Sequence, residues 1–226
     1  MNYLVCDFET TSLDAMRGSP VSIGAYMLDE DLNELSEFYS TIKPYENSWW
    51  SMDAEEVHGF TREESQEFPH NTVVYSDFRD WLSDYGSKFR FVCHAQSRSG
   101  VTSAFDYNFM YWWFTLNCAV LGSLPDMDTI FPRGSGYTTI RPASESPKEL
   151  YGIANQKLGT WMDKLGIDKK AHHNSLFDAK VCAEILRFQK NSNGELYENG
   201  KANEDQPLIK GIQNKEDNQR SDSIPF

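Results

Sequence analysis

A short apolar run near the start of the chain ends in two acidic residues, and it restricts the fold more than any other segment. Tyr3 to Cys6 is apolar without alternation, which is typical of a central strand covered on both faces. Asp7 and Glu9 follow at once, two residues apart. Because side chains alternate along a strand, both carboxylates are expected on one face, where they form half of a site for Mg²⁺ or Mn²⁺. Taken alone, the pair also fits a strand end that reaches solvent.

The segments after this strand predict an α/β fold, with a mixed sheet flanked by helices. Two further β-prone runs, 21–28 and 37–42, predict an antiparallel meander with the first strand. The later patterns predict helices at 53–57, 72–85, 104–116, 148–158 and 175–189, and strands at 89–93 and 127–129. Residues 133–147 are rich in Gly, Ser, Thr and Pro, which predicts a loop beside the working face.

The composition fits one globular domain followed by a polar tail. The chain has 226 residues, of which 39% are hydrophobic and 14% aromatic, enough to bury a substantial core. We place this domain at residues 1–190. Residues 191–226 are rich in Asn, Glu, Lys and Gly and poor in large apolar side chains, which predicts a flexible tail.

The charge and the cysteines exclude several classes of protein. A net charge of −13 argues against broad neutralisation of phosphates by Lys and Arg, so any contact with nucleic acid is expected to be local and assisted by cations held on carboxylates. No pair of cysteines has CxxC spacing, so neither a zinc site nor a disulfide framework is indicated, and reduced thiols in the cytoplasm are expected. We expect no signal peptide and no membrane span.

Two further acids open predicted helices. Asp106 ends Ser103-Ala104-Phe105-Asp106, and Asp178 ends Ser175-Leu176-Phe177-Asp178. Ser-x-x-Asp is a helix-capping pattern, and an acid in the first turn interacts favourably with the helix dipole. Local physics alone therefore favours a cap over a metal ligand for each of them.

His173 lies five positions before Asp178. Five residues along a helix turn a side chain well off the original face, so His173 is expected in the loop before the helix, from which its imidazole could overhang a metal site. A histidine with a pKa near neutrality suits a general base that activates water. The alternative is an exposed loop histidine, which is the expectation for His172.

The order and context of these motifs resemble the DEDDh exonuclease superfamily, which includes the proofreading subunit of bacterial replicative polymerases. The resemblance covers roughly residues 2–186 and rests on concerted motifs. Three of them are Asp7-Phe8-Glu9-Thr10-Thr11-Ser12-Leu13, Phe105-Asp106 followed by Phe109, and His173-Asn174-Ser175-Leu176-Phe177-Asp178-Ala179. Weaker matches are Val57-His58-Gly59-Phe60-Thr61, Asp128-Thr129 and Leu165-Gly166-Ile167. Asn174 stands where a related subclass has tyrosine, which favours the histidine subclass. The chain departs from the family at His94-Ala95, where His-Asn is usual, and in the inserted residues 96–103.

The resemblance implies a ribonuclease H-like fold with a mixed five-stranded sheet, three antiparallel strands and then parallel ones. It implies a 3′→5′ exonuclease that releases 5′-mononucleotides from single-stranded DNA ends. Asp7, Glu9, Asp106 and Asp178 would hold two Mg²⁺ or Mn²⁺ ions, and His173 would take the proton from the attacking water. The expected contacts of the terminal nucleotide are the backbone near Thr10 and Thr11, an apolar wall from Phe8, Leu13 or Phe105, and His58 near the 3′-terminal sugar.

Two other functions stay open. The same fold could act on RNA ends or short oligoribonucleotides, since no residue announces a contact to the 2′-hydroxyl. A non-catalytic interaction module with an inherited fold is the second, although all five catalytic positions are filled. The terminal Ile224-Pro225-Phe226 resembles the tip of bacterial single-strand-binding proteins and could dock on a replication or repair protein. A frayed terminus is the favoured interpretation of this tail.

Overall fold

The computed structural model describes residues 1–94, 96–98, 101–103, 105–121, 130–131, 137–139 and 146–193. The strand predicted at 127–129, with the Asp128-Thr129 match, lies outside the described residues. The same holds for much of the predicted loop at 133–147 and for the tail beyond Asn193. The boundary between domain and tail therefore stays a prediction.

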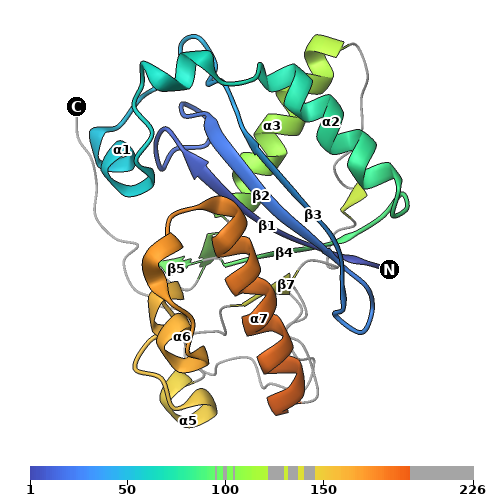
Figure 1. The fold of residues 1–226 in the computed structure, drawn as a ribbon, viewed down its shortest axis with the longest axis vertical. Helices are drawn as coiled ribbons and strands as arrows, with labels where there is room; N and C mark the ends of the chain where they lie inside the picture. The colour runs from blue at the N-terminus through green and yellow to red at the C-terminus, as the bar shows by residue number, and fades with distance from the viewer. Residues whose placement is uncertain are drawn as a thin grey trace, which may run out of the picture.

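An open mixed sheet forms the centre of the fold, with the strand order β3-β2-β1-β4-β7 (Figure 1). The first three strands are β1 (Tyr3–Thr10), β2 (Pro20–Leu28) and β3 (Glu34–Thr41), and they pair in the predicted antiparallel meander. β4 (Arg90–Cys93) lies parallel to β1. The predicted α/β fold with a mixed sheet flanked by helices is confirmed. The four strands β1 to β4 make up most of this sheet.

The edge position beyond β4 is taken by β7 (Tyr137–Thr138), a parallel strand of two residues. It falls inside the segment predicted to be a loop, so that prediction is wrong at these residues. The sequence Tyr137-Thr138-Thr139 is β-prone, but the Gly, Ser and Pro residues on both sides of it are typical of a loop, and the prediction followed them.

Helices cover both faces of the sheet, with α2 (Asn71–Ser83) and α3 (Phe105–Leu121) on one side and α7 (Ser175–Asn193) on the other (Figure 1). Alternate side chains of β1 enter the two cores that result. Leu4, Cys6 and Phe8 pack in the core under α2 and α3, whereas Tyr3 and Val5 pack in the core under α7. This burial on both faces explains why the strand is apolar without alternation.

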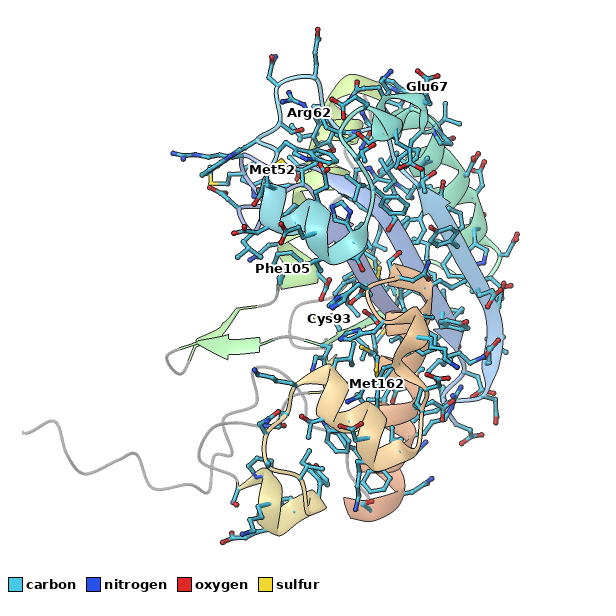
Figure 2. The ribbon with its side chains drawn as sticks, turned by 60° about the vertical axis from the view of Figure 1, so that its left-hand side comes forward. Met52, Arg62, Glu67, Cys93, Phe105 and Met162 are labelled. Atoms are coloured by element: carbon cyan, nitrogen blue, oxygen red, sulfur yellow. The ribbon has the colours of Figure 1, made fainter. Side chains whose placement is uncertain are left out.

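The remaining elements of the described chain are short. They are α1 (Met52–His58), η1 (Glu64–Glu67), β5 (Gln96–Arg98), β6 (Val101–Ser103), α5 (Pro147–Tyr151), α6 (Leu158–Leu165) and η2 (Lys169–Ala171). Within the inserted residues, β5 and β6 pair antiparallel and project between α1 and α6 (Figure 2). The helix predicted at 148–158 is confirmed only at its start, because α5 ends at Tyr151 and the following Gly152 has a left-handed φ of 69°, which favours glycine. Within the described part of the chain, every helix is too short or too polar to cross a lipid bilayer.

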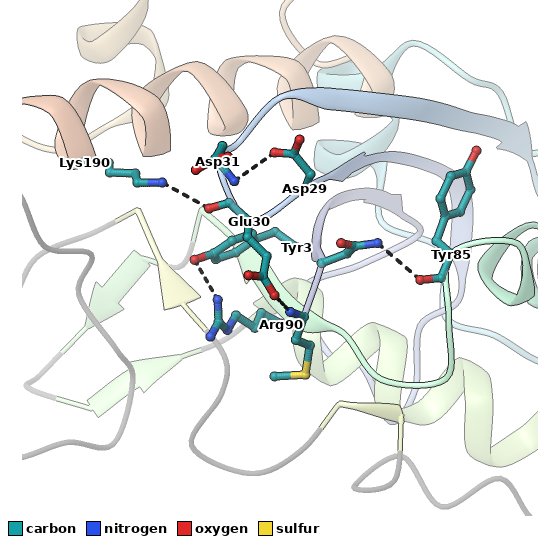
Figure 3. A network of polar contacts seen from close by, with 9 residues as sticks. Tyr3, Asp29, Glu30, Asp31, Tyr85, Arg90 and Lys190 are labelled. Carbon is teal, nitrogen blue, oxygen red and sulfur yellow. Dashed lines mark hydrogen bonds and ion pairs between the residues drawn. The ribbon is translucent and has the colours of Figure 1, made fainter.

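A polar network holds the end of the sheet where β1 begins (Figure 3). The Arg90 guanidinium donates to the Tyr3 hydroxyl over 3.0 Å, and the Lys190 ammonium donates to the Glu30 carbonyl over 3.1 Å. The Met1 amino group pairs with the Glu30 carboxylate. These contacts join β1, the β2–β3 turn, β4 and α7. Asp7 and Glu9 lie at the opposite end of β1. The pair of Met1 and Glu30 is exposed, so solvent screens it and it adds little to stability.

Candidate active site

Asp7 and Glu9 lie near the carboxyl end of β1, and their side chains meet a third acid from α7. One oxygen from each of Asp7, Glu9 and Asp178 lies within 4.8 Å of the others. The intervening Phe8 points to the opposite face, where its ring lies 6.1 Å from that of Trp113 in an edge-on contact. At this end of β1, the side chains of Asp7 and Glu9 therefore lie on one face and that of Phe8 on the other.

Gly24 allows α7 to come close enough for this meeting. It lies opposite Asp7 in the register of β1 and β2. A Cβ atom at Gly24 would lie 2.1 Å from the Leu176 nitrogen, a separation that real Cβ atoms do not show. The first turn of α7 is thus in direct contact with the β2 backbone, and a glycine inside a strand permits such an approach. This contact brings Asp178 beside Asp7.

A second contact fixes the start of α7 two residue pairs further along β1 and β2. Ser22 lies opposite Glu9, and its hydroxyl oxygen is 2.9 Å from that of Ser175. Both serines are buried. A hydrogen bond between two buried hydroxyls satisfies groups that would otherwise be costly to bury. The register of α7 on β2 is therefore held by this pair together with the close approach at Gly24.

The cap of α7 differs from the predicted one. Asn174, not Ser175, is the capping residue, because its side-chain oxygen accepts a hydrogen bond from the Phe177 N–H over 3.1 Å. Ser175 is already helical and directs its hydroxyl to Ser22. Asp178 does interact with the backbone before the helix, as a capping acid would, since its carboxylate accepts from the His173 N–H over 3.0 Å. The same carboxylate also lies close to Asp7 and Glu9.

Asp106 approaches the same place from α3. Its Oδ1 accepts a hydrogen bond from the Phe8 N–H over 3.2 Å, and Phe8 stands between Asp7 and Glu9 in the chain. Asp106 is 3% exposed, so its carboxylate interacts with the neighbouring acids through a poorly screened environment. Asp7, Glu9, Asp106 and Asp178 together are called the four-acid cluster below.

Burial raises the pKa of every member of the four-acid cluster, and neighbouring acids add to the rise in Asp7, Glu9 and Asp106. Burial, and then the charges of Asp178 and Asp106, raises the pKa of Glu9 to about 8. Burial also raises the pKa of Asp106 to about 7, against the opposing effect of the Phe8 N–H. The pKa of Asp7 rises through burial first and Asp106 second, and the pKa of Asp178 rises through burial. Groups that repel one another in this way, and offer only oxygen, fit a divalent cation such as Mg²⁺ or Mn²⁺.

Two histidines stand beside Asp178, and their places differ from those expected. His173 lies in the loop before α7 with a φ of 70°, and its ring is exposed. His172 is partly buried, and its Nδ1 lies 3.0 Å from an Asp178 oxygen, so the expectation of an exposed loop histidine is wrong for it. The left-handed turn at His173, the next residue, places the His172 side chain in contact with the first turn of α7. Burial, and then His172, lowers the pKa of His173.

Two of the residues expected to contact substrate are enclosed by the fold. The Phe8 side chain is 3% exposed and belongs to the core, so it forms no wall at the surface. The Thr11 backbone is occupied, because its N–H donates to the Ser19 carbonyl over 2.9 Å and its carbonyl accepts from the Ser51 N–H over 2.7 Å. The expected contacts of Phe8 and Thr11 with substrate are therefore corrected. Alternation along β1 turns the Phe8 side chain into the core, and the segment between β1 and β2 buries Thr11.

The other expected contacts lie closer to the surface, with one exception. Leu13 is 82% exposed. Phe105 is half-buried against Phe109, with ring centroids 4.8 Å apart, and lies below α1 in Figure 2. His58, at the end of α1, is partly buried, and burial is the main reason why its pKa is lowered. Thr10 is buried, and its hydroxyl donates to the Ser12 carbonyl over 2.8 Å.

His94 is a further histidine near the site whose environment the sequence did not indicate. It follows β4, and its Nδ1 lies 2.7 Å from the Thr139 hydroxyl. Burial lowers the pKa of His94 to about 4, and His172 acts in the same direction. Gly24, Ser22 and His172 were missed as well. Of these three residues, only Gly24 could have been identified from the sequence, because a glycine within a β-prone run indicates close approach of another backbone.

Known proteins share both the fold and the sequence pattern. The RNase T family model, described as an exonuclease, matches residues 4–186. PolC-type DNA polymerase III proteins of Thermotoga petrophila and Thermotoga maritima are 27% identical over 187 residues, which is 82% of this chain. The chain spans only 12% of the length of these relatives.

Solved structures show the same fold at low identity. E. coli Exonuclease I in complex with a dT13 oligonucleotide superposes with a TM-score of 0.66 and 13% identity, over 85% of this chain and 42% of that one. The zinc-bound form of an E. coli Exonuclease I complex with single-stranded DNA gives a TM-score of 0.65 and 12% identity, over 85% and 41% of the two chains. From the family match over 4–186, we conclude that this chain belongs to the RNase T exonuclease family, within the DEDDh-type 3′–5′ exonuclease superfamily.

Proposed function

We propose that this chain removes nucleotides one at a time from the 3′ end of single-stranded DNA and releases 5′-mononucleotides. The observation that carries the proposal is the convergence of acids from β1, α3 and α7, far apart in the sequence, with two histidines beside them. Membership of an exonuclease family supports the reaction. The oligonucleotide complexes of E. coli Exonuclease I with dT13 and dA16 favour single-stranded DNA as the substrate.

The four-acid cluster would hold two Mg²⁺ or Mn²⁺ ions, which would supply positive charge to the scissile phosphate and to the attacking and leaving oxygens. The protein fixes the acids in advance. Asp106 is held by the Phe8 N–H, and Asp178 by the His173 N–H. Such preorganisation limits the reorganisation needed when the substrate arrives.

His173 would take the proton from the attacking water. Its exposed ring leaves it open to water, and its lowered pKa keeps the ring neutral near neutral pH, the form that accepts a proton. Leu13 and Phe105 are the proposed apolar contacts for the terminal base, and His58 is proposed to lie near the terminal sugar.

Two proposals from the sequence concern the setting of the reaction. Cytoplasmic location is supported by four cysteines that are buried as free thiols. A replication or repair protein that binds Ile224-Pro225-Phe226 is the proposed partner. Neither proposal bears on the chemistry of the four-acid cluster.

Matched DNA and RNA single strands of one sequence, labelled at the 5′ end, test the proposed reaction. With Mg²⁺ or Mn²⁺, we expect DNA to shorten stepwise from its 3′ end and to yield 5′-mononucleotides, and EDTA to stop the reaction. Asp7→Ala should abolish it, whereas Asp77→Ala, an exposed acid of α2, should not. Undiminished degradation by Asp7→Ala would contradict the proposed site, and faster degradation of RNA would overturn the proposed substrate.

A further inference from the structure

Two imidazoles and one carboxylate meet at the edge of the four-acid cluster. One ligand atom from each of His172, His173 and Asp178 lies within 4.8 Å of the others. The two rings are stacked, with centroids 3.9 Å apart and planes 16° from parallel. His172 Nδ1 is 3.0 and 3.1 Å from the two Asp178 oxygens. This arrangement differs from the all-oxygen group of Asp7, Glu9 and Asp178.

The backbone holds these three side chains close to one another. His173 has a φ of 70°, and its N–H donates to one Asp178 oxygen over 3.0 Å. Asp178 itself is in the first turn of α7. The turn at His173 and the start of α7 therefore set the positions of the three backbones. His and Asp side chains have few rotatable bonds, so ordering them around a bound ion costs little conformational entropy.

The ligand types select among cations. Imidazole nitrogen suits Zn²⁺, which is bound by a combination of His and Asp in many proteins. Mg²⁺ prefers oxygen and retains its water molecules, so a site with two imidazoles suits it poorly. His173 is exposed and His172 partly so, and water can therefore supply the remaining ligands of a bound ion.

We propose that His172, His173 and Asp178 form a second cation site that prefers Zn²⁺ to Mg²⁺. The absence of CxxC spacing in the sequence excludes only zinc sites built on cysteine. Asp178 belongs to both groups, so a zinc ion bound here would compete for it and would also take up His173. Zinc would then inhibit the exonuclease. This last consequence rests on the proposed function, whereas the binding itself does not.

Calorimetric titration with zinc tests the site without reference to activity, on the full chain first stripped of metal and then placed in excess Mg²⁺. Visible absorption of bound Co²⁺ gives a second measure of nitrogen coordination. His172→Asn and His173→Asn should each weaken zinc binding by at least about tenfold, since even the loss of an outer partner of a ligand has an effect of that size. His70→Asn is the matched control, because His70 is exposed and caps α2, and Asn is a good cap. It should bind zinc like the unchanged chain.

Asp7→Asn distinguishes the proposed site from the all-oxygen group. Zinc binding that survives in Asp7→Asn and is weakened in both histidine variants supports the proposal. Zinc binding that is lost in Asp7→Asn and kept in both histidine variants overturns it, as does equal binding by His172→Asn and His70→Asn. Thermal melting of each variant verifies that it is folded. A chain that binds zinc through the histidines but leaves DNA intact with Mg²⁺ refutes the proposed function alone.

Discussion

Asp7 lies directly opposite Gly24 in the antiparallel pairing of β1 and β2, and the first turn of α7 rests on that glycine. The separation between sheet and helix at this point sets how closely Asp178 approaches Asp7. A strand position that carries no side chain thus controls the geometry of the four-acid cluster.

Gly24→Ala should damage both stability and activity. The new Cβ would lie 2.1 Å from the Leu176 nitrogen, so α7 must move away from β2. We expect a loss of about 1–3 kcal/mol in the free energy of unfolding, as in other overpacked sites. Exonuclease activity should fall by at least about tenfold, because small displacements of reacting groups are costly. Urea denaturation and a single-turnover assay measure the two effects.

The control for this prediction is Gly159→Ala in α6. Its new Cβ would meet only the flexible Lys169 side chain, 3.8 Å away, and alanine favours a helix over glycine. We expect unchanged activity and equal or greater stability. Wild-type rates in Gly24→Ala would show that the close packing of α7 does not position Asp178.

The metal-free protein should become less stable as the pH rises from about 6.5 to about 8. Burial and neighbouring acids raise the pKa of Glu9 to about 8 and of Asp106 to about 7, above their unfolded values near 4. The folded state therefore binds more protons than the unfolded state in this range, and stability decreases as these protons are lost. Each loss of about 1 kcal/mol lowers the Tm by roughly 2–4 °C for a chain of this size.

Glu9→Gln tests the cause of that pH dependence. The variant lacks one repelling charge, so its metal-free Tm should exceed that of the unchanged chain at about pH 8 and vary less with pH. Its activity should be lost, because a ligand is missing. Melting curves in EDTA give the result, and an unaltered pH dependence in Glu9→Gln would refute the role of Glu9. The window avoids His94, whose lowered pKa of about 4 has the opposite effect on stability and only below about pH 6.5.

Loss of the Asn174 cap should loosen the start of α7. Asn174→Ala removes the acceptor for the Phe177 N–H and should cost about 1 kcal/mol, whereas Asn174→Ser retains a capping oxygen and should cost much less. Activity should follow the same order, because Asp178 lies in the turn that Asn174 caps. Denaturation and rate measurements on both variants check this, and equal stability of the two would argue against the cap.

The sequence predicted the parts of the site that depend on local periodicity. Alternation along β1 was enough to expect Asp7 and Glu9 on one face, and the spacing of His173 from Asp178 was enough to expect the histidine in the preceding loop. For Asp106 and Asp178, the local pattern favoured helix caps. Only the resemblance to a family grouped them with Asp7, because their convergence depends on tertiary packing.

The features that the sequence could not predict depend on contacts between distant segments. His172 is partly buried because a left-handed turn and the start of α7 meet there. Alternation puts Phe8 on the face opposite Asp7 and Glu9, but its burial there depends on the packing of Trp113 from α3. β7 depends on pairing with β4, and its two residues carry too little periodicity to identify a strand.

Calorimetric titration of Mg²⁺ into the metal-free chain tests most directly whether the four acids act together on a cation. We predict that Asp106→Asn and Asp178→Asn each weaken Mg²⁺ binding by at least about tenfold, as expected for lost ligands. His173→Asn should bind Mg²⁺ normally while its exonuclease rate falls by about 10²-fold or more, as expected for a lost general base. Unchanged Mg²⁺ affinity in Asp106→Asn and Asp178→Asn would contradict the site.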